Sequence, residues 1–229
     1  MQELSPKRTQ TQQRLLDAAF RVLASDGFAG ASIETIVAEA GFTRGAFYSN
    51  FESKEELFAA VVDREMRRRL ELVKVAVAQL GEGDMPVPVT ADVLGKLLEA
   101  VIVDPQTERE WQIVMTELEL DELRNPGGPS ALAEPDLAYI DEVAEALIPA
   151  VNRLGIEFDG DPDVIIRLLI NGYLAVIRQA LRGLPRGADI SITPQLEWFT
   201  VLVEKFLRVP QDPGERRAGA HLRRRLRPH

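Results

Sequence analysis

A short stretch from Ser32 to Lys54 carries the side chains whose types and spacing are best suited to chemistry. Arg44 has a planar guanidinium group that can donate two parallel hydrogen bonds to O6 and N7 of guanine. Hydroxyl groups and a lysine ammonium suit phosphate oxygens, which fix the register of a protein on a duplex without reading its sequence. The pattern predicts hydrogen bonding to a nucleic acid, with Arg44 as the first choice for a base contact. The predicted contact residues are Ser32, Thr43, Arg44, Gly45, Tyr48, Ser49 and Lys54.

Two short helices joined by a glycine-containing turn are predicted to position these side chains. Ser32 can cap the first helix by accepting a hydrogen bond from an unpaired backbone N–H. Gly41 ends that helix, because glycine adopts positive φ at little steric cost, and Thr43 caps a second helix to about Asn50. By periodicity alone, this pattern fits a DNA-binding helix-turn-helix or a helical hairpin that only packs. The apolar positions at helical spacing are Ile33, Ile36, Val37, Ala40, Phe47 and Phe51.

A longer helix is predicted to follow from Ser53 to about Leu80. It opens with a capping box, in which Ser53 and Glu56 each satisfy the other's backbone N–H. A helix of this length can act as a rigid lever between the helix-turn-helix and a second domain.

The run ASIETIVAEAGFTRGAFYSNFESKEELF closely resembles the DNA-binding domain of the tetracycline-repressor (TetR) family of bacterial transcriptional regulators. The similarity covers roughly residues 8–65, with the motif at 32–51, and beyond it only the architecture is shared. The resemblance implies a homodimeric repressor that binds double-stranded operator DNA and releases it when a small-molecule inducer enters the second domain. The residues at the motif positions are Ser32, Gly41, Phe47, Tyr48, Phe51, Ser53, Lys54 and Leu57.

Charge is distributed unevenly along the 229 residues, whose formal net charge is −9. Residues 1–50 hold five basic and five acidic groups, whereas residues 81–160 hold 4 basic and 18 acidic groups. Residues 207–229 hold seven arginines and two acidic groups. Separate functional regions produce such asymmetry. The excess negative charge lies outside the helix-turn-helix, so it does not oppose binding of that region to nucleic acid. The Arg-rich tail is interpreted as a disordered solvated segment, with an accessory phosphate contact as the alternative.

The composition argues against an enzyme. The chain has no cysteine, and its two histidines, His221 and His229, both lie in the tail. The folded part therefore offers neither a thiolate nor an imidazole for catalysis or metal binding, and no glycine-rich phosphate loop is present. We expect no catalytic residue, no cofactor and no bound metal. The carboxylates Glu117, Glu119, Asp121 and Glu122 are interpreted as a solvated helix end, with a hard-cation site as the minor alternative.

The predicted fold class is all-α, because no segment alternates with period two for long enough to form a strand. No apolar run approaches the length of a membrane span, and the N-terminus lacks the apolar core of a signal peptide, which predicts a cytoplasmic protein. The predicted domains are a helix-turn-helix domain at 1–56, a helical ligand-binding and dimerisation domain at 57–209, and the tail at 210–229. The other predicted helices cover 5–27, 92–103, 105–124, 130–154 with Pro135 and Pro149 favouring a kink, 164–181 and 194–208.

The last two predicted helices are apolar over most of their circumference, so each must be buried on more than one side. They form either the centre of the domain or a contact with a second copy of the chain. The resemblance implies the second option, a four-helix dimer interface, in which Gly172 permits close approach. The predicted interface residues are Ile165, Leu169, Gly172, Val176, Ile177, Phe199, Leu202 and Phe206.

Large side chains of the second domain belong to its core by default, but the resemblance implies that some of them line an inducer cavity. The acidic domain favours a lipophilic cation over a fatty acid or an acyl thioester. An alternative function is a helical adaptor that binds a partner protein through this acidic domain. The candidate ligand-binding residues are Trp111, Met115, Glu119, Tyr139, Asn171, Tyr173 and Arg178.

Overall fold

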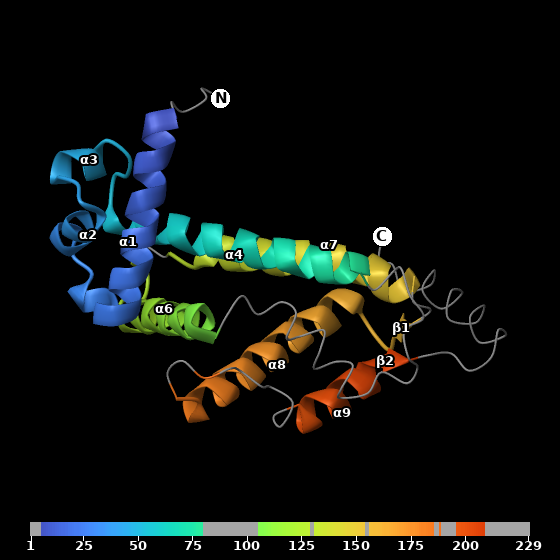
Figure 1. Ribbon diagram of the computed structural model, residues 1–229. Coiled ribbons are helices and arrows are strands. Elements are labelled where there is room, and N and C mark those ends of the chain that lie inside the picture. The colour runs from blue at the N-terminus through green and yellow to red at the C-terminus, as the bar shows by residue number, and fades with distance from the viewer. Residues whose placement is uncertain are drawn as a thin grey trace. The chain divides into compact units, whose positions relative to one another are not determined.

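The computed structural model describes residues 6–79, 105–128, 131–153, 156–185, 188 and 196–208. Helices dominate these ranges, which confirms the predicted all-α class (Figure 1). Two short strands, β1 (Glu157–Phe158) and β2 (Leu207–Arg208), pair antiparallel. The predicted helix over 92–103 lies outside the described residues. The helices are α1 (Pro6–Gly30), α2 (Ile33–Ala40), α3 (Arg44–Tyr48), α4 (Lys54–Gln79), α6 (Pro105–Arg124), α7 (Ala133–Arg153), α8 (Pro162–Gly183) and α9 (Glu197–Phe206).

The predicted end of the first helix near Gly27 coincides with a break in α1: Gly27 has a non-helical φ of 71° and ψ of 178°, and a short helical segment follows it to Gly30. One predicted helix end was wrong. α9 ends at Phe206 instead of Arg208, because Leu207 and Arg208 pair with β1. That pairing also corrects the expectation that the chain has no strand, although each strand is too short to show an alternating pattern.

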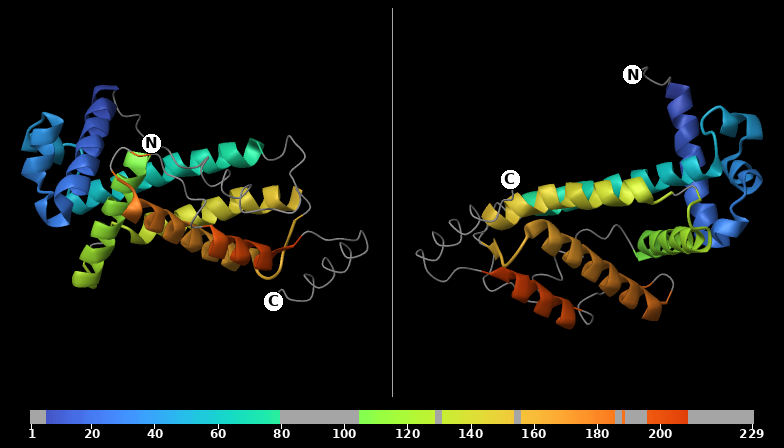
Figure 2. Two further views of the ribbon diagram at one scale, coloured as in Figure 1. Left: turned by 60° about the horizontal axis from the view of Figure 1, so that its bottom comes forward. Right: turned by 180° about the vertical axis from the view of Figure 1, so that it is seen from behind.

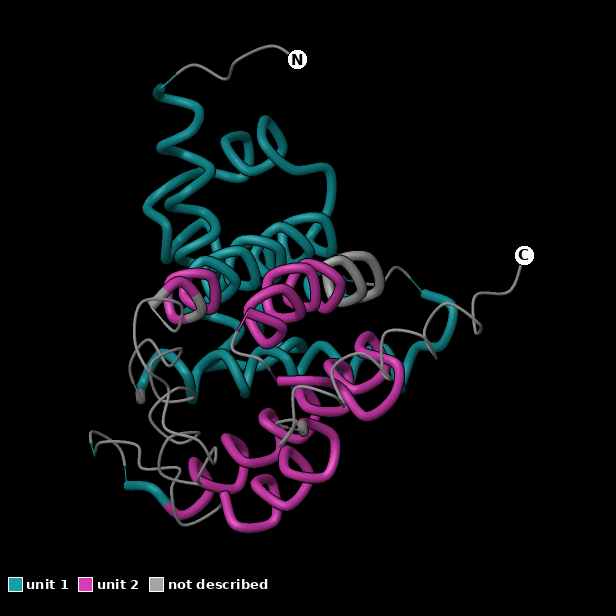
Figure 3. Tube along the Cα trace, turned by 90° about the vertical axis from the view of Figure 1, so that its right-hand side faces the viewer, with its two compact units in different colours: residues 1–71, 102–139, 184–190 teal, residues 72–101, 140–183, 191–229 magenta. Residues whose placement is uncertain are grey.

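The chain forms two compact units, which Figure 3 draws in different colours. The first unit comprises residues 1–71, 102–139 and 184–190, and the second comprises 72–101, 140–183 and 191–229. Each of the two helices α4 and α7 therefore contributes residues to both units. The predicted boundary after residue 56 separates a DNA-binding domain from a ligand-binding and dimerisation domain, so it describes function and not packing. It stays a prediction.

The first unit has a continuous apolar core that holds the short helices against α1. α1 packs on both α2 and α6, and Figure 2 shows the blue helices α1, α2 and α3 together in both views. Burying each large aliphatic or aromatic side chain contributes about 1.5 to 3 kcal/mol. The fully buried side chains of this core include Leu15, Leu23, Ile36, Phe47, Leu57, Phe58, Val61 and Val62.

In the second unit, α8 packs closely on α9. A Cβ atom at Gly172 would lie 2.7 Å from Cε2 of Phe199, so only glycine allows this approach of the two helices. α8 is also long and apolar enough to cross a membrane by length and composition alone, contrary to the expectation from the sequence. Core helices of soluble proteins pass the same test.

Candidate nucleic-acid interface

The predicted caps of the two short helices are confirmed. Ser32 Oγ accepts a hydrogen bond from the Thr35 N–H at 3.1 Å, and Thr43 Oγ1 accepts one from the Ala46 N–H at 3.4 Å. Gly41 has φ 69°, in the left-handed region that favours glycine. Ser32 sets where α2 begins, Gly41 sets where it ends and Thr43 sets where α3 begins, so Gly41 and Thr43 together fix the direction in which α3 leaves the turn.

One face of α3 is anchored and the other is exposed. Phe47 is fully buried, and its ring lies 6.0 Å from that of Phe51 and 5.2 Å from that of Tyr48. Tyr48 is 52% exposed. The side chains of Arg44 and Ser49 are exposed as well. The anchored aromatic rings therefore present Arg44, Tyr48 and Ser49 to the surroundings, as the sequence predicted.

Two arginines of α1 brace the turn and the end of α3. Arg14 donates to the Ala40 carbonyl at 2.8 Å and lies 4.6 Å from the centre of the Phe42 ring. Arg8 donates to the Ser49 carbonyl at 3.2 Å, where a cation is favourable because the carbonyls of the last turn point outward. Sequence reasoning missed both contacts, since they join positions far apart in the chain.

Arg44 is held by two neighbours. Its Nη1 lies 2.8 Å from Glu34 Oε1, and its Nη2 donates to the Tyr48 hydroxyl at 3.4 Å. The hydrogen bond to Tyr48 and the charge of Glu34 raise the pKa of the Arg44 guanidinium above its usual value. Glu34 was not among the predicted site residues, and its place in the first turn of α2 was the only signal for it.

Lys54 lies differently from the other predicted contacts. Its ammonium donates to the Phe28 carbonyl at 3.4 Å and lies 4.0 Å from the centre of the Phe28 ring. The capping box at this helix start is only half formed, because Glu56 accepts from the Glu52 N–H instead of the Ser53 N–H. Lys54 thus has a structural role within the first unit, and its predicted phosphate contact stays a prediction.

Comparisons with known proteins agree on this region. Residues 15–61 match the model of bacterial regulatory proteins of the tetR family. This match covers most of α1, all of α2 and α3, and the start of α4. It is 29% identical over 110 residues to the HTH-type transcriptional regulator AcrR of Shigella flexneri, covering 48% of this chain and 50% of AcrR. It is 28% identical over 109 residues to the transcriptional repressor AcnR of Corynebacterium glutamicum, covering 46% of this chain and 58% of AcnR.

The chain spans about half the length of these curated relatives. Solved structures extend the similarity of fold over most of the chain. A putative TetR-family regulator from Mesorhizobium loti superposes with a TM-score of 0.62 at 21% identity, covering 89% of this chain and 97% of that chain. The multidrug binding protein EbrR, complexed with imidazole, gives a TM-score of 0.56 at 23% identity, covering 87% and 96%. These likenesses show the all-helical TetR-family fold.

The candidate ligand-binding residues of this chain fall into both units. Trp111, Met115, Glu119 and Tyr139 belong to the first unit, whereas Asn171, Tyr173 and Arg178 belong to the second. In the first unit, Trp111 is buried and Met115 packs against the core, whereas Glu119 is exposed. In the second, Asn171 is exposed, and its amide donates to the Arg167 carbonyl. Their role in ligand binding stays a prediction.

Trp111 and Tyr139 adjoin a buried charged network in the first unit. Arg69 Nη1 lies 3.3 Å from Glu65, its Nη2 lies 3.3 Å from Glu108, and its guanidinium lies 4.4 Å from the centre of the Trp111 ring. Burial raises the pKa of Tyr139 to about 12, while Arg69 lowers it and Glu108 raises it further. The charged groups of this network satisfy one another, which is what a stable buried ion cluster requires.

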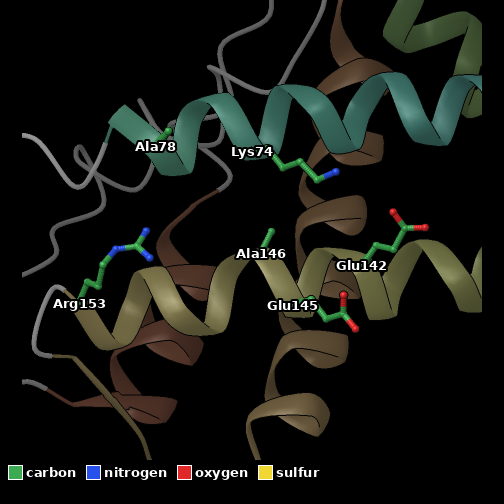
Figure 4. Close-up of a pocket in the computed structure, with 6 residues that line it drawn as sticks. All are labelled: Lys74, Ala78, Glu142, Glu145, Ala146 and Arg153. Carbon is green, nitrogen blue, oxygen red and sulfur yellow. The ribbon is translucent and has the colours of Figure 1, made fainter.

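An open pocket of about 420 Å³ lies in the second unit (Figure 4). Lys74 and Ala78 line it from α4, and the other side chains come from α7. None of its lining residues was predicted from the sequence as ligand-binding. The lining residues on α7 are Glu142, Glu145, Ala146 and Arg153.

The acidic end of α6 is more than a solvated surface. Glu117 Oε2 accepts the backbone N–H of Phe28 at 3.0 Å, and Glu122 Oε1 accepts that of Leu132 at 3.3 Å. Among the described residues, no group of three or more carboxylates or histidines is arranged to hold a metal ion.

Most of the predicted dimer-interface residues are buried within the chain itself. Five of them lie in the core of the second unit: Ile165, Gly172, Val176, Ile177 and Phe199. Leu169, Leu202 and Phe206 are partly exposed. Other apolar side chains of α8 and α9 are exposed instead, to 62% at Val164, 41% at Leu168, 41% at Trp198 and 63% at Val201.

Proposed function

We propose that the protein is a sequence-specific DNA-binding transcriptional regulator of the cytoplasm. We further propose that it is a homodimeric repressor, which a lipophilic small molecule releases from its operator. The observation that carries the DNA-binding proposal is the geometry of α3: a capped short helix with Phe47 buried below and Arg44, Tyr48 and Ser49 exposed above. The exposed face of α3 fits the major groove, where an arginine can hydrogen-bond to guanine, while hydroxyl groups can bind the phosphates that border the groove.

Exposed apolar side chains on α8 and α9 support the homodimer. Val164 and Leu168 are four residues apart on α8, and Trp198 and Val201 are three apart on α9, so each pair shares one helix face. Covering such a surface with a second copy removes apolar area from water. A two-fold dimer would also supply the two recognition helices that bind half-sites one helical turn, about 34 to 36 Å, apart.

The long helix α4 supports regulation by a change of geometry. It is one continuous element from Lys54, just after α3, to Gln79, which belongs to the second unit. A ligand that binds the second domain can shift the spacing of the recognition helices only by its differential affinity for the two forms. EbrR, a structural neighbour, is described as a multidrug binding protein, which supports a lipophilic ligand here. The repressor AcnR supports repression as the direction of control.

The DNA-binding proposal can be tested without knowing the operator. Duplexes selected by the wild-type protein from a random pool would define its preferred sequence. Arg44→Ala should then weaken binding and relax the preference at one position of each half-site, by about 1 to 3 kcal/mol. Arg21→Ala is the matched control, since Arg21 is an exposed arginine of the same domain paired with Glu39 at 2.9 Å. If the wild type enriches no sequence, the adaptor function becomes the better hypothesis.

Ligand release can be tested through thermodynamic linkage. Tetraphenylphosphonium, a lipophilic cation, is a suitable first probe in titrations with and without the selected duplex. If the probe releases DNA, the duplex must weaken probe binding by the factor by which the probe weakens DNA binding. Equal probe affinities in the two titrations would show that this cation is not an inducer.

A further inference from the structure

Every arginine in the first 50 residues of the chain is held by an acceptor within the first unit. Two of these arginines donate to backbone carbonyl groups and two form ion pairs with carboxylates of α2. The four contacts are Arg8 with the Ser49 carbonyl, Arg14 with the Ala40 carbonyl, Arg21 with Glu39 and Arg44 with Glu34.

The two ion pairs are closely matched. The Arg44–Glu34 distance is 2.8 Å with side chains 59% and 60% exposed, and the Arg21–Glu39 distance is 2.9 Å with side chains 54% and 45% exposed. They differ in the position of the arginine. Arg44 opens the exposed α3, whereas Arg21 belongs to α1.

Glu34 and Tyr48 leave part of the Arg44 guanidinium free to bind. A guanidinium group has five N–H donors. Glu34 binds at Nη1 and Tyr48 binds at Nη2, each through one contact. Donors therefore remain for the O6 and N7 acceptors of a guanine while both neighbours stay in place.

A phosphate meets a different environment at the same arginine. Phosphate carries a full negative charge, and it would be repelled by the Glu34 carboxylate beside the guanidinium. A base edge carries only partial charges and is repelled much less. The Glu34–Arg44 pair thus favours a base contact over a phosphate contact, a form of specificity that weakens the wrong complex.

We propose that Glu34 is a specificity-determining residue, which holds Arg44 for a base edge and keeps it from binding phosphate. This inference rests on the proposed DNA-binding function. It assigns Glu34 no direct contact with DNA, because its effect acts through Arg44.

The test compares Glu34→Gln with Glu39→Gln in the full-length protein. Both changes remove one negative charge from an exposed ion pair of α2, so general electrostatic attraction to DNA rises equally. Dissociation constants would be measured over a range of salt concentrations for the duplex selected by the wild type and for a scrambled duplex of the same composition. Thermal unfolding of each variant would verify that it is folded.

Glu34→Gln should strengthen binding to the scrambled duplex by up to about fivefold, the scale of an exposed ion pair. Its salt dependence on that duplex should steepen by about one phosphate contact, because Arg44 is now free to bind phosphate. Affinity for the selected duplex should change less. The specificity ratio, which is the affinity for the selected duplex divided by the affinity for the scrambled duplex, should therefore fall. Glu39→Gln should leave the ratio unchanged, and in an Arg44→Ala background Glu34→Gln should no longer alter it.

Equal effects of the two variants on the scrambled duplex would overturn the inference, because general charge would then explain both. A loss of affinity for the selected duplex without a gain for the scrambled one would also overturn it, since Glu34 would then only support the base contact. Either outcome leaves the DNA-binding proposal intact if the wild type discriminates between the duplexes. A wild type that does not discriminate refutes the DNA-binding proposal itself.

Discussion

Glu117 on α6 accepts the backbone N–H of Phe28 at 3.0 Å, across 89 positions of sequence. The Phe28 carbonyl in turn accepts from the Lys54 ammonium at 3.4 Å. Both backbone groups of Phe28 are therefore held by side chains from other helices, at the point where α1 turns towards α2. Any shift of α6 relative to α1 must either break the hydrogen bond between Glu117 and Phe28 or move Phe28 with α6.

Removing the Glu117 carboxylate should destabilise the first unit. Glu117→Ala leaves the partly buried Phe28 N–H without its charged acceptor, which should lower the free energy of unfolding by roughly 1 to 3 kcal/mol. Glu119→Ala, two residues along the same helix and exposed, should change it by less than about 0.5 kcal/mol. Chemical denaturation measures both, and equal losses would show that the hydrogen bond to Phe28 contributes little.

Gly27 should tolerate no side chain. Its φ of 71° and ψ of 178° lie in a region that only glycine adopts readily, and an added Cβ atom would lie 2.8 Å from Glu117 Oε2. Gly27→Ala should therefore cost about 1 to 3 kcal/mol in thermal or chemical unfolding. Gly183→Ala is the control, because a Cβ atom there meets nothing within 4 Å. Similar stabilities of the two variants would contradict this account.

Local contacts were predictable from the sequence, whereas contacts between distant positions were not. The caps at Ser32, Gly41 and Thr43 were predictable because each is satisfied by residues within three or four positions. The role of Glu117 was not, because its partner is 89 positions away and a carboxylate near a helix end looks solvated.

Tertiary packing also determines the surroundings of the apolar residues of α8 and α9 and of Lys54, which the sequence alone does not show. The apolar stripes of α8 and α9 were recognisable, but their pattern does not say which stripe faces the partner helix and which faces outward. Ile177 and Phe199 proved to be core residues, whereas Leu168 and Val201 are exposed. Lys54 was expected to point at phosphate, but the Phe28 ring and carbonyl hold its ammonium.

Breaking the buried network at Arg69 should be strongly destabilising. Arg69 is 8% exposed and contacts both Glu65 and Glu108 at 3.3 Å. Arg69→Met removes the cation that pairs with the buried Glu108 carboxylate, whereas Glu65 keeps Arg64 at 3.0 Å. An unpaired buried carboxylate should cost roughly 3 to 5 kcal/mol. Arg67→Met, at an exposed pair with Asp63 on the same helix, should cost at most about 1 kcal/mol. Urea denaturation of the two variants would separate these effects, and a small loss at Arg69 would mean that water enters the network.

The proposed dimer contact should respond to charge at exposed positions. Leu168→Glu combined with Val201→Glu places two carboxylates on the apolar surface of α8 and α9, where a partner would have to bury them at high cost. Sedimentation should then show a monomer that retains its helical circular dichroism. Gln179→Glu with Lys205→Gln changes the net charge equally at exposed polar positions of the same helices and should leave a dimer. A dimer in the first variant would place the contact elsewhere.

The stability of the first unit should depend on pH through Tyr139. Burial raises the pKa of its hydroxyl to about 12 in the folded protein, whereas an unfolded tyrosine has a pKa of about 10. Below about pH 10 both states keep the proton and the contribution of Tyr139 is fully present. Between about pH 10 and 12 the unfolded chain loses the proton while the folded chain keeps it. The free energy of unfolding should therefore fall as pH rises, by up to about 1.4 kcal/mol per pH unit.

Tyr139→Phe removes this dependence, so the difference in unfolding free energy between wild type and variant should be constant below about pH 10 and decline above it. A difference that stays constant through about pH 11 would show that the hydroxyl of Tyr139 is in contact with water.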